Sequence, residues 1–255
     1  MIDEKMIASR YRLDKKFVRT FNQWMSQARR SSAGEESRSR ILDAAEALFA
    51  DHGYDGVSIR QITEAAGVQT SMVNYYFGSK DALWSAVFER RSAHLGESRR
   101  SRLDALERHH APASPPLESL IDAFVRPILE ARLSGDPGWQ SFTRLIAQAS
   151  NTPNVRNVEQ LSQQYDPTAR RFIAAFGHAL PDRSEEEVMW GFSFLMGAML
   201  HIFAETRRVD RLSDGHYRSA SLERITDHLT PFLAAGFRAC RAAPDSSRPS
   251  EGPAP

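Results

Sequence analysis

Apolar residues recur along most of this chain with the spacing of an α-helix, and this periodicity restricts its fold more than any other feature. Ile41, Ala44, Ala45, Leu48 and Phe49 occupy positions i, i+3, i+4, i+7 and i+8, which form one face of an amphipathic helix. The same spacing returns in later segments, and no series of alternating, strand-like segments occurs. The sequence therefore predicts an all-α fold.

The helices expected in the N-terminal part are short and closely spaced. Ser58 and Gln61 have the spacing of a capping box that starts a second helix, and Gly67 ends it after about two turns. A third helix is expected over about 70–76, and Ser79 can cap a fourth. Two short helices joined by a glycine-containing turn, with longer helices on both sides, form the plan of a helix-turn-helix.

The second helix of such a motif fits the major groove, where short polar side chains reach base edges. Val68, Val73 and Phe77 are expected to face inward. Four side chains would then face the groove: Thr70, Ser71, Asn74 and Tyr75.

Spaced positions over residues 36–90 resemble the N-terminal signature of the TetR (tetracycline repressor) family. The matching segments are Ile41–Phe49, Gly53-Tyr54, Val57–Ile59, Ala65–Val68 and Tyr75–Lys80. The resemblance implies an N-terminal three-helix helix-turn-helix DNA-binding domain and a C-terminal helical domain that binds a ligand and forms a homodimer. It further implies a ligand-responsive regulator, expected to be a repressor, that binds a palindromic double-stranded DNA operator and is released by a small apolar effector.

The resemblance also implies contacts for individual residues. Arg60 and the exposed residues of the third helix would meet the operator, and Tyr75, Tyr76 and Lys80 would touch phosphates. Tyr76 is equally readable as a packing aromatic, and Lys80 as a solvated side chain. The chain departs from the common pattern at two positions, Asn74 in place of Tyr and Gln69 in place of a capping Ser. Asn can pair with adenine through two hydrogen bonds, so Asn74 is a candidate for base recognition, and the third helix begins at Gln69 or Thr70.

Charge is unevenly distributed along the N-terminal part. Residues 35–95 hold six Lys and Arg against nine Asp and Glu, a net charge of −3. DNA affinity must then come from where the positive charges lie, namely residues 29–40, Arg60 and Lys80, and the acids at 43, 46 and 51 are expected to face away from DNA. Residues 1–34, by contrast, carry a net charge of +5. Their apolar spacing permits an amphipathic helix. Three interpretations of this segment are open: a basic arm that contacts DNA, a helix that binds a partner, or the product of an upstream start codon.

The remaining chain reads as helices separated by breaks. A linker is expected over about 106–116, and a proline-, serine- and alanine-rich tail is expected to be disordered. Helices are expected at about 117–129, 139–150, 154–164, 167–180, 184–208 and 222–240. The chain is accordingly divided into an extension (1–34), a helix-turn-helix domain (35–90), a ligand-binding and dimerisation domain (91–240) and a tail (241–255).

Val188–Phe203 is apolar nearly all round, which predicts burial against both its own domain and a partner subunit. Segments around Phe142 and Pro231 resemble the fatty-acid-responsive members of the family. A set of aromatic and polar residues is predicted to form an apolar ligand pocket, together with Met196 and Met199, although core or dimer-interface roles remain open for most of them. That set is Trp139, Phe142, Arg144, Gln148, Phe172, Phe176, Trp190, Phe194 and His201.

Other classes of protein are disfavoured. The single cysteine, Cys240, is consistent with a reducing cytoplasm, and no secretory signal or membrane-spanning segment of about 20 apolar residues is seen. The chain has no glycine-rich phosphate loop, metal-ligand spacing or nucleophile motif, so neither an enzyme nor a cofactor is expected, and His109 and His110 read as solvated linker residues. The alternative is a helical ligand-binding or membrane-associated protein without specific DNA binding.

Overall fold

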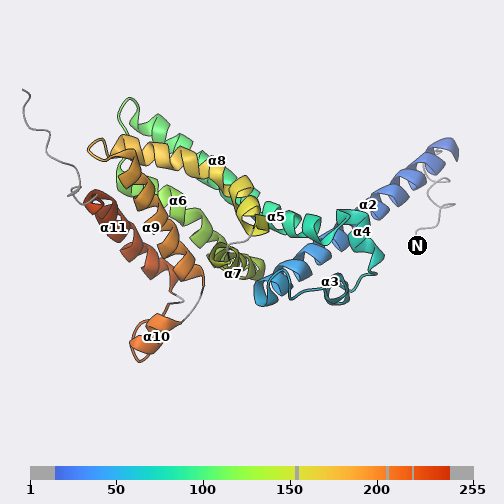
Figure 1. The fold of residues 1–255 in the computed structure, drawn as a ribbon. Helices are drawn as coiled ribbons and strands as arrows, with labels where there is room; N and C mark the ends of the chain where they lie inside the picture. Colours follow the sequence, from blue (N-terminus) through green and yellow to red (C-terminus); the bar gives the residue numbers. More distant parts are fainter. Residues whose placement is uncertain (1–14, 153–154, 205–206, 220, 242–255) are drawn as a thin grey trace, which may run out of the picture.

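The computed structural model describes residues 15–152, 155–204, 207–219 and 221–241, and within these ranges every regular element is a helix (Figure 1). The N-terminal helices are α2 (Lys15–His52), α3 (Ile59–Ala66) and α4 (Ser71–Phe77), followed by the long α5 (Lys80–His110). The C-terminal helices are α6 (Leu117–Leu133), α7 (Pro137–Asn151), α8 (Val155–Ala179), α9 (Glu185–Phe203), α10 (Arg208–Leu212) and α11 (Leu222–Ala239). The predicted all-α fold is confirmed.

Helix α2 passes through the expected boundary between residues 34 and 35 without a break. Residues 15–34 of the basic extension therefore belong to the same helix as the amphipathic segment around Ile41, and residues 1–14 lie outside the described part of the chain. The apolar face predicted from the periodicity is buried, because Ile41, Ala45 and Phe49 are all inaccessible to solvent.

The turns around α3 and α4 follow the predicted chemistry. The Ser58 hydroxyl accepts a hydrogen bond from the Gln61 amide, and the Gln61 side chain accepts one from the Ser58 amide. Gly67 adopts φ 63° at the end of α3, a left-handed conformation that costs other residues energy. Helix α4 begins at Ser71, with Thr70 at its N-cap, and the Ser79 hydroxyl caps α5 by accepting from the Ala82 amide.

Three expected boundaries in the C-terminal half are wrong. Helix α5 continues to His110, so both histidines of the expected linker lie in its last turn. Basic side chains at this end of a helix interact favourably with its dipole. The expected helices 154–164 and 167–180 are one helix, α8, because Pro167 lies inside it and removes only one backbone donor. Helix α9 ends at Phe203, and α10 was not expected. The tail from residue 242 lies outside the described residues.

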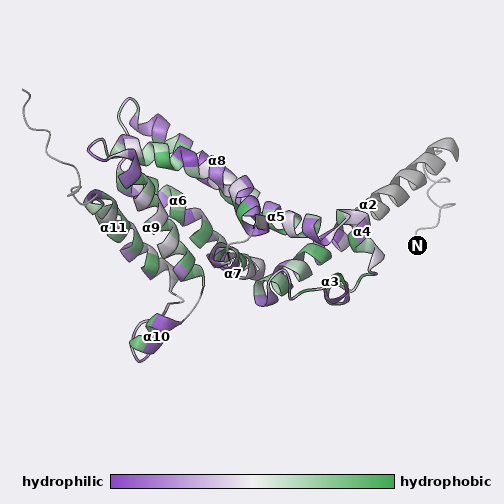
Figure 2. Cartoon of the chain, viewed as in Figure 1, coloured by the Kyte–Doolittle hydropathy of each residue, from purple (hydrophilic) through white to green (hydrophobic). Residues whose placement is uncertain are grey.

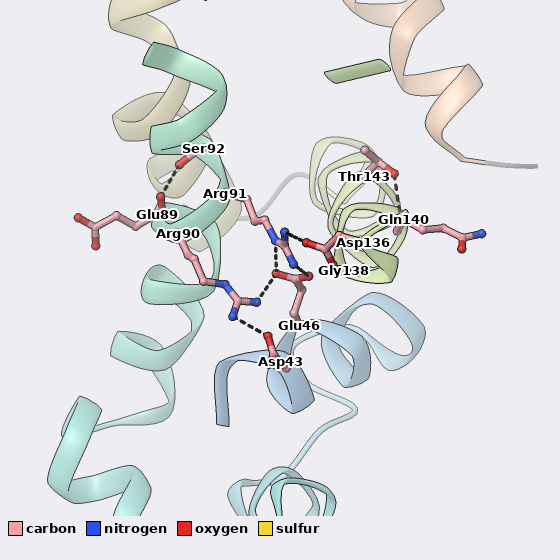
Figure 3. Close-up of polar contacts among 10 residues, drawn as sticks. All are labelled: Asp43, Glu46, Glu89, Arg90, Arg91, Ser92, Asp136, Gly138, Gln140 and Thr143. Carbon is pink, nitrogen blue, oxygen red and sulfur yellow. Dashed lines mark hydrogen bonds and ion pairs between the residues drawn. The ribbon is translucent and has the colours of Figure 1, made fainter. Parts of the chain in front are cut away.

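A buried carboxylate joins the N-terminal helices to the C-terminal ones (Figure 3). Glu46 on α2 is 1% exposed and accepts hydrogen bonds from Arg90 and Arg91 of α5, at 2.7 and 3.1 Å. Arg90 also bonds to Asp43, and Arg91 also bonds to Asp136. Asp136 in turn caps α7 by accepting from the Gly138 amide at 2.8 Å. This cluster of five side chains, which we call the Glu46 cluster, holds α2, α5 and α7 together.

Replacing Glu46 by alanine is expected to lower the free energy of unfolding by about 2 kcal/mol. This loss lies below the 3–5 kcal/mol typical of a broken buried ion pair, because Arg90 and Arg91 keep Asp43 and Asp136. Urea unfolding followed by circular dichroism measures the change. Glu97→Ala is the matched control, since the exposed Glu97–Arg100 pair is worth less than about 1 kcal/mol. Equal losses in both variants would contradict the structural role of Glu46.

Replacing Gly67 by alanine is expected to cost about 1 kcal/mol, because its left-handed backbone strains any residue with a Cβ. No steric clash contributes, since the nearest atom to the added Cβ is an arginine nitrogen 3.9 Å away. Gly177→Ala is the control: Gly177 lies within α8 with no atom within 4 Å of its Cβ position, so stability should rise by up to about 1 kcal/mol. Thermal unfolding of both variants measures the difference in sign.

Candidate nucleic-acid interface

Helix α4 presents a polar face to solvent while its opposite side is anchored in the core. Val73 is fully buried, whereas Tyr75 is 78% exposed and Thr70, Ser71 and Asn74 are also exposed. Within the described part of the chain, no residue hydrogen-bonds to the side chains of Ser71 or Asn74. Their hydrogen-bonding groups are therefore available to a partner that approaches α4.

Thr70 and Tyr76 have structural contacts of their own. The Thr70 hydroxyl lies 3.4 Å from that of Thr63, which is buried on α3. Tyr76 is half-buried, its ring meets those of Tyr75 and Phe77 edge-on, and a Cβ built on Gly34 of α2 would lie 3.4 Å from its hydroxyl. These contacts support the packing interpretation of Tyr76.

Arg60 projects from α3 and is engaged with a neighbour on the same helix. Its guanidinium forms a 2.7 Å ion pair with Glu64, one turn further on, and both side chains are largely exposed. An exposed pair of this kind has little strength, so Arg60 can exchange Glu64 for a phosphate at small cost.

Lys80 lies in a cluster that the sequence analysis did not identify. Two cations lie close to the ring of Tyr54: Lys80 Nζ is 4.0 Å and the Arg156 guanidinium 3.7 Å from its centroid. The Tyr54 hydroxyl donates to Asp81 at 2.7 Å, and Arg156 donates to the same carboxylate oxygen at 2.9 Å. Because Arg156 belongs to α8, this Tyr54 cluster joins the start of α8 to the turn after α2 and to the start of α5.

The contacts of the Tyr54 cluster shift three pKa values. Burial and the hydrogen bond to Asp81 raise the pKa of Tyr54 to about 12, so its hydroxyl stays protonated. The hydrogen bonds from Tyr54 and Arg156 lower the pKa of Asp81, and burial lowers the pKa of Lys80. Tyr54 belongs to the Gly53-Tyr54 motif noted in the sequence, but Arg156 is 75 residues from Asp81 and no local pattern connects them.

The charges of α2 are sorted between its two sides. Arg38 lies 5.2 Å from the centre of the Phe77 ring of α4, and Arg40 lies beside the turn at Gly67. The acids at 43, 46 and 51 instead form ion pairs with arginines of α5 and α7. Basic side chains consequently border α4 although the net charge of the segment is negative.

The C-terminal helices contain an apolar cavity of about 320 Å³. Helices α5 to α9 all contribute to its wall, and the predicted residues Met196 and Met199 line it, but none of the other nine predicted pocket residues does. A larger hollow, of about 780 Å³, lies over the Glu46 cluster, whose charged groups are already paired with one another.

The nine predicted pocket residues are distributed over three other environments. Phe142, Phe172 and Phe176 are core residues packed against other aromatic rings, and Trp139 lies under the Arg91 guanidinium. Three residues of α9 are exposed, namely Trp190, Phe194 and His201. Arg144 forms an ion pair with Asp51 of α2 at 3.1 Å, and Gln148 lies next to Gly53. Helical periodicity identifies apolar faces but not the surface that each face contacts.

Arg99 and Tyr165 line the cavity and were missed by the sequence analysis. A signal was present for Arg99, because it takes the place of an apolar residue between Leu95 and Leu103, which are four residues away on either side and buried.

In the described ranges, no helix is long and apolar enough to cross a membrane, and no three His, Cys, Asp or Glu side chains are grouped as metal ligands would be.

Comparison with known proteins assigns both halves of the chain. Residues 41–87 match the family profile described as bacterial regulatory proteins, tetR family, and residues 122–236 match the profile of the tetracyclin repressor-like C-terminal domain. The chain is 36% identical over 62 residues to the transcriptional repressor AcnR of Corynebacterium efficiens, covering 24% of this chain and 33% of AcnR. It is also 36% identical over 162 residues to the transcriptional regulator BetI of Serratia proteamaculans, covering 64% of this chain and 78% of BetI.

Solved structures share the fold at low sequence identity. FadR from Bacillus subtilis, solved in complex with stearoyl-CoA, has a TM-score of 0.56 at 14% identity, covering 78% of this chain and 98% of FadR. PfmR, a TetR family regulator from Thermus thermophilus, has a TM-score of 0.54 at 16% identity, covering 77% and 95%. The relatives are regulatory proteins, in agreement with the prediction that the chain is not an enzyme. The chain belongs to the TetR family of transcriptional regulators.

Proposed function

We propose that the protein regulates transcription by binding a palindromic DNA operator as a homodimer, with α4 as the recognition helix. The observation that carries the proposal is the polar face of α4, where Ser71 and Asn74 are exposed with hydrogen-bonding groups that no described residue uses. Asn74 would read a base in the major groove, and Tyr75 would contact a phosphate. Arg38 and Arg40, which border α4, would add charge contacts to the backbone.

The homodimer would form through α9 and α11, which lie side by side at the outer edge of the C-terminal helices (Figure 1). Met189, Trp190 and Phe194 expose a large apolar surface on α9, and Phe232 on α11 is 71% exposed. Figure 2 shows hydrophobic residues along both helices. Exposed apolar surface of this kind is typical of an interface, and two recognition helices one DNA turn apart require a dimer.

The packing between α9 and α11 supports a shared interface. A Cβ on Gly191 would lie only 2.5 Å from the Phe237 ring, so the two helices meet closely at this point. Because the pair is held this tightly, the exposed residues of both helices can act as one surface. Trp190 and Phe194, whose rings stack on each other with centroids 6.1 Å apart, are both exposed and would belong to that surface.

A small apolar effector would occupy the cavity among α5 to α9 and release the operator. FadR, which has the same fold, was solved with stearoyl-CoA, and the apolar wall of the cavity suits a related chemistry. The helices of this wall also contact α2 and the turn that follows it. Arg91 of α5 pairs with Glu46, Arg144 of α7 pairs with Asp51, and Arg156 of α8 lies over the ring of Tyr54. An effector shifts the DNA-binding state only by its difference in affinity for two conformations, about 5.5 kcal/mol for a full switch.

Asn74→Ala and Tyr75→Phe are expected to affect DNA binding differently. Loss of a two-bond base contact should remove about 1–3 kcal/mol of preference at one base-pair position. Loss of the Tyr75 hydroxyl should weaken binding by a similar factor to every operator variant, without changing the salt dependence, because the phenol is uncharged. Fluorescence anisotropy with the DNA upstream of the protein's own gene and single-base variants of it measures both effects.

Gln163→Ala, at an exposed position of α8, is the control and should bind all these DNA fragments like the wild type. Absence of sequence-specific binding by the wild-type protein would favour the alternative, a helical ligand-binding protein without specific DNA binding. A loss spread evenly over all operator variants in Asn74→Ala would make Asn74 a positioning residue.

Phe232→Glu is expected to give monomers that no longer bind the operator, because a charge would be buried at the centre of the proposed interface. Light scattering after size-exclusion chromatography measures the mass. Leu133→Glu places the same charge at an exposed apolar residue of α6 and should leave the dimer intact. A wild-type monomer, or a Phe232→Glu dimer with full affinity for DNA, would contradict this interface.

A further inference from the structure

The cavity among α5 to α9 contains a buried cation without a matching anion. Arg99 projects from α5, is only 5% exposed and lines the cavity. Its Nε donates to the backbone carbonyl of Phe124 at 2.8 Å, and its guanidinium lies 4.0 Å from the centre of the Phe124 ring. In the part of the chain that the structure describes, no carboxylate forms an ion pair with it. Burial lowers its pKa to about 10, which still leaves it charged at neutral pH.

A second polar group beside Arg99 lacks a partner. The Tyr165 hydroxyl lines the same cavity, is buried, and has no hydrogen-bond partner among the described residues. One carboxylate, Asp166, also reaches the wall, but it pairs with Arg170 on the outer side of α8 at 3.3 Å. A buried charge and a buried hydroxyl are costly unless they are paired, so this corner of an otherwise apolar cavity is incomplete without a ligand.

We propose that the cavity binds an amphipathic monocarboxylate, with its carboxylate paired to Arg99 and accepting a hydrogen bond from Tyr165. The apolar part of the ligand would lie among Phe192, Met196 and Phe203. A volume of about 320 Å³ is at the small end of the range for ligand pockets, so a single chain or ring of moderate length fits. The inference rests on the proposed effector function and defines the chemical class of the effector.

The test compares sodium decanoate with 1-decanol, which has the same chain without the charge. Isothermal titration calorimetry on the full chain is expected to show decanoate binding about ten-fold or more tighter, because hydrogen bonds to charged groups are the strong ones. 4-Phenylbutanoate and 4-phenylbutanol repeat the comparison with a ring. If neither acid binds more tightly than its alcohol, the proposal is overturned.

Arg99→Met should reduce the affinity for decanoate to that for decanol and leave decanol binding unchanged, whereas Tyr165→Phe should cause a smaller loss, about three- to ten-fold. Arg100→Met, the adjacent arginine with an exposed side chain, should bind both ligands like the wild type. Arg99→Lys keeps the charge and should bind decanoate more tightly than Arg99→Met does. Arg99→Met with wild-type decanoate affinity would overturn the proposal.

Thermal unfolding without ligand shows that each variant is folded, which methionine in place of a buried unpaired cation should permit. DNA release is measured separately by anisotropy. Decanoate binding that depends on Arg99 in a protein that keeps its DNA would leave this inference standing and contradict the effector role in the proposed function. Sequence-specific DNA binding by a protein that does not prefer the acids to the alcohols would overturn this inference and leave the proposed DNA-binding function standing.

Discussion

A carboxylate that is removed from water must be neutralised by charges that the fold brings to it, and Glu46 meets this requirement with two arginines of α5. Arg91 extends the network to Asp136, which caps α7. The angle between the N-terminal helices and the C-terminal helices is therefore fixed at a site where both charge and backbone hydrogen bonds have to be satisfied. Salt would screen such a buried cluster much less than it screens the exposed pairs on the surface.

Helix α5 is the element that the two proposed functions share. It is capped by Ser79 directly after α4, it carries Arg91 in its middle, and it places Arg99 in the apolar cavity. Arg91 and Arg99 are eight residues apart, about 12 Å along the helix axis. A ligand that binds Arg99 would therefore contact the same helix that pairs with α2 through Arg91. Two further contacts also connect the C-terminal helices to the N-terminal part of the chain. Helix α7 does so through the Arg144–Asp51 pair, and α8 does so through the Tyr54 cluster.

Local features were predictable from the sequence, and contacts between distant segments were not. The caps at Ser58 and Ser79 and the end of α3 at Gly67 follow from short motifs, and the exposed face of α4 follows from the period of the helix. The pocket residues did not follow, because an aromatic residue on an apolar face looks alike whether it contacts a core, a partner or a cavity. Pairs such as Arg144–Asp51 join residues that no short motif relates.

The close approach of Gly191 and Phe237 sets the distance between α9 and α11, the two helices of the proposed dimer interface. Any side chain larger than hydrogen at residue 191 would push α9 and α11 apart and alter the surface that they present together. In the proposed two-fold symmetric dimer such a displacement would occur twice, once in each subunit, and would change the distance between the two proposed recognition helices. The half-site spacing that the protein accepts on DNA would then depend on residue 191 being a glycine, although this residue lies far from the proposed DNA-binding helix.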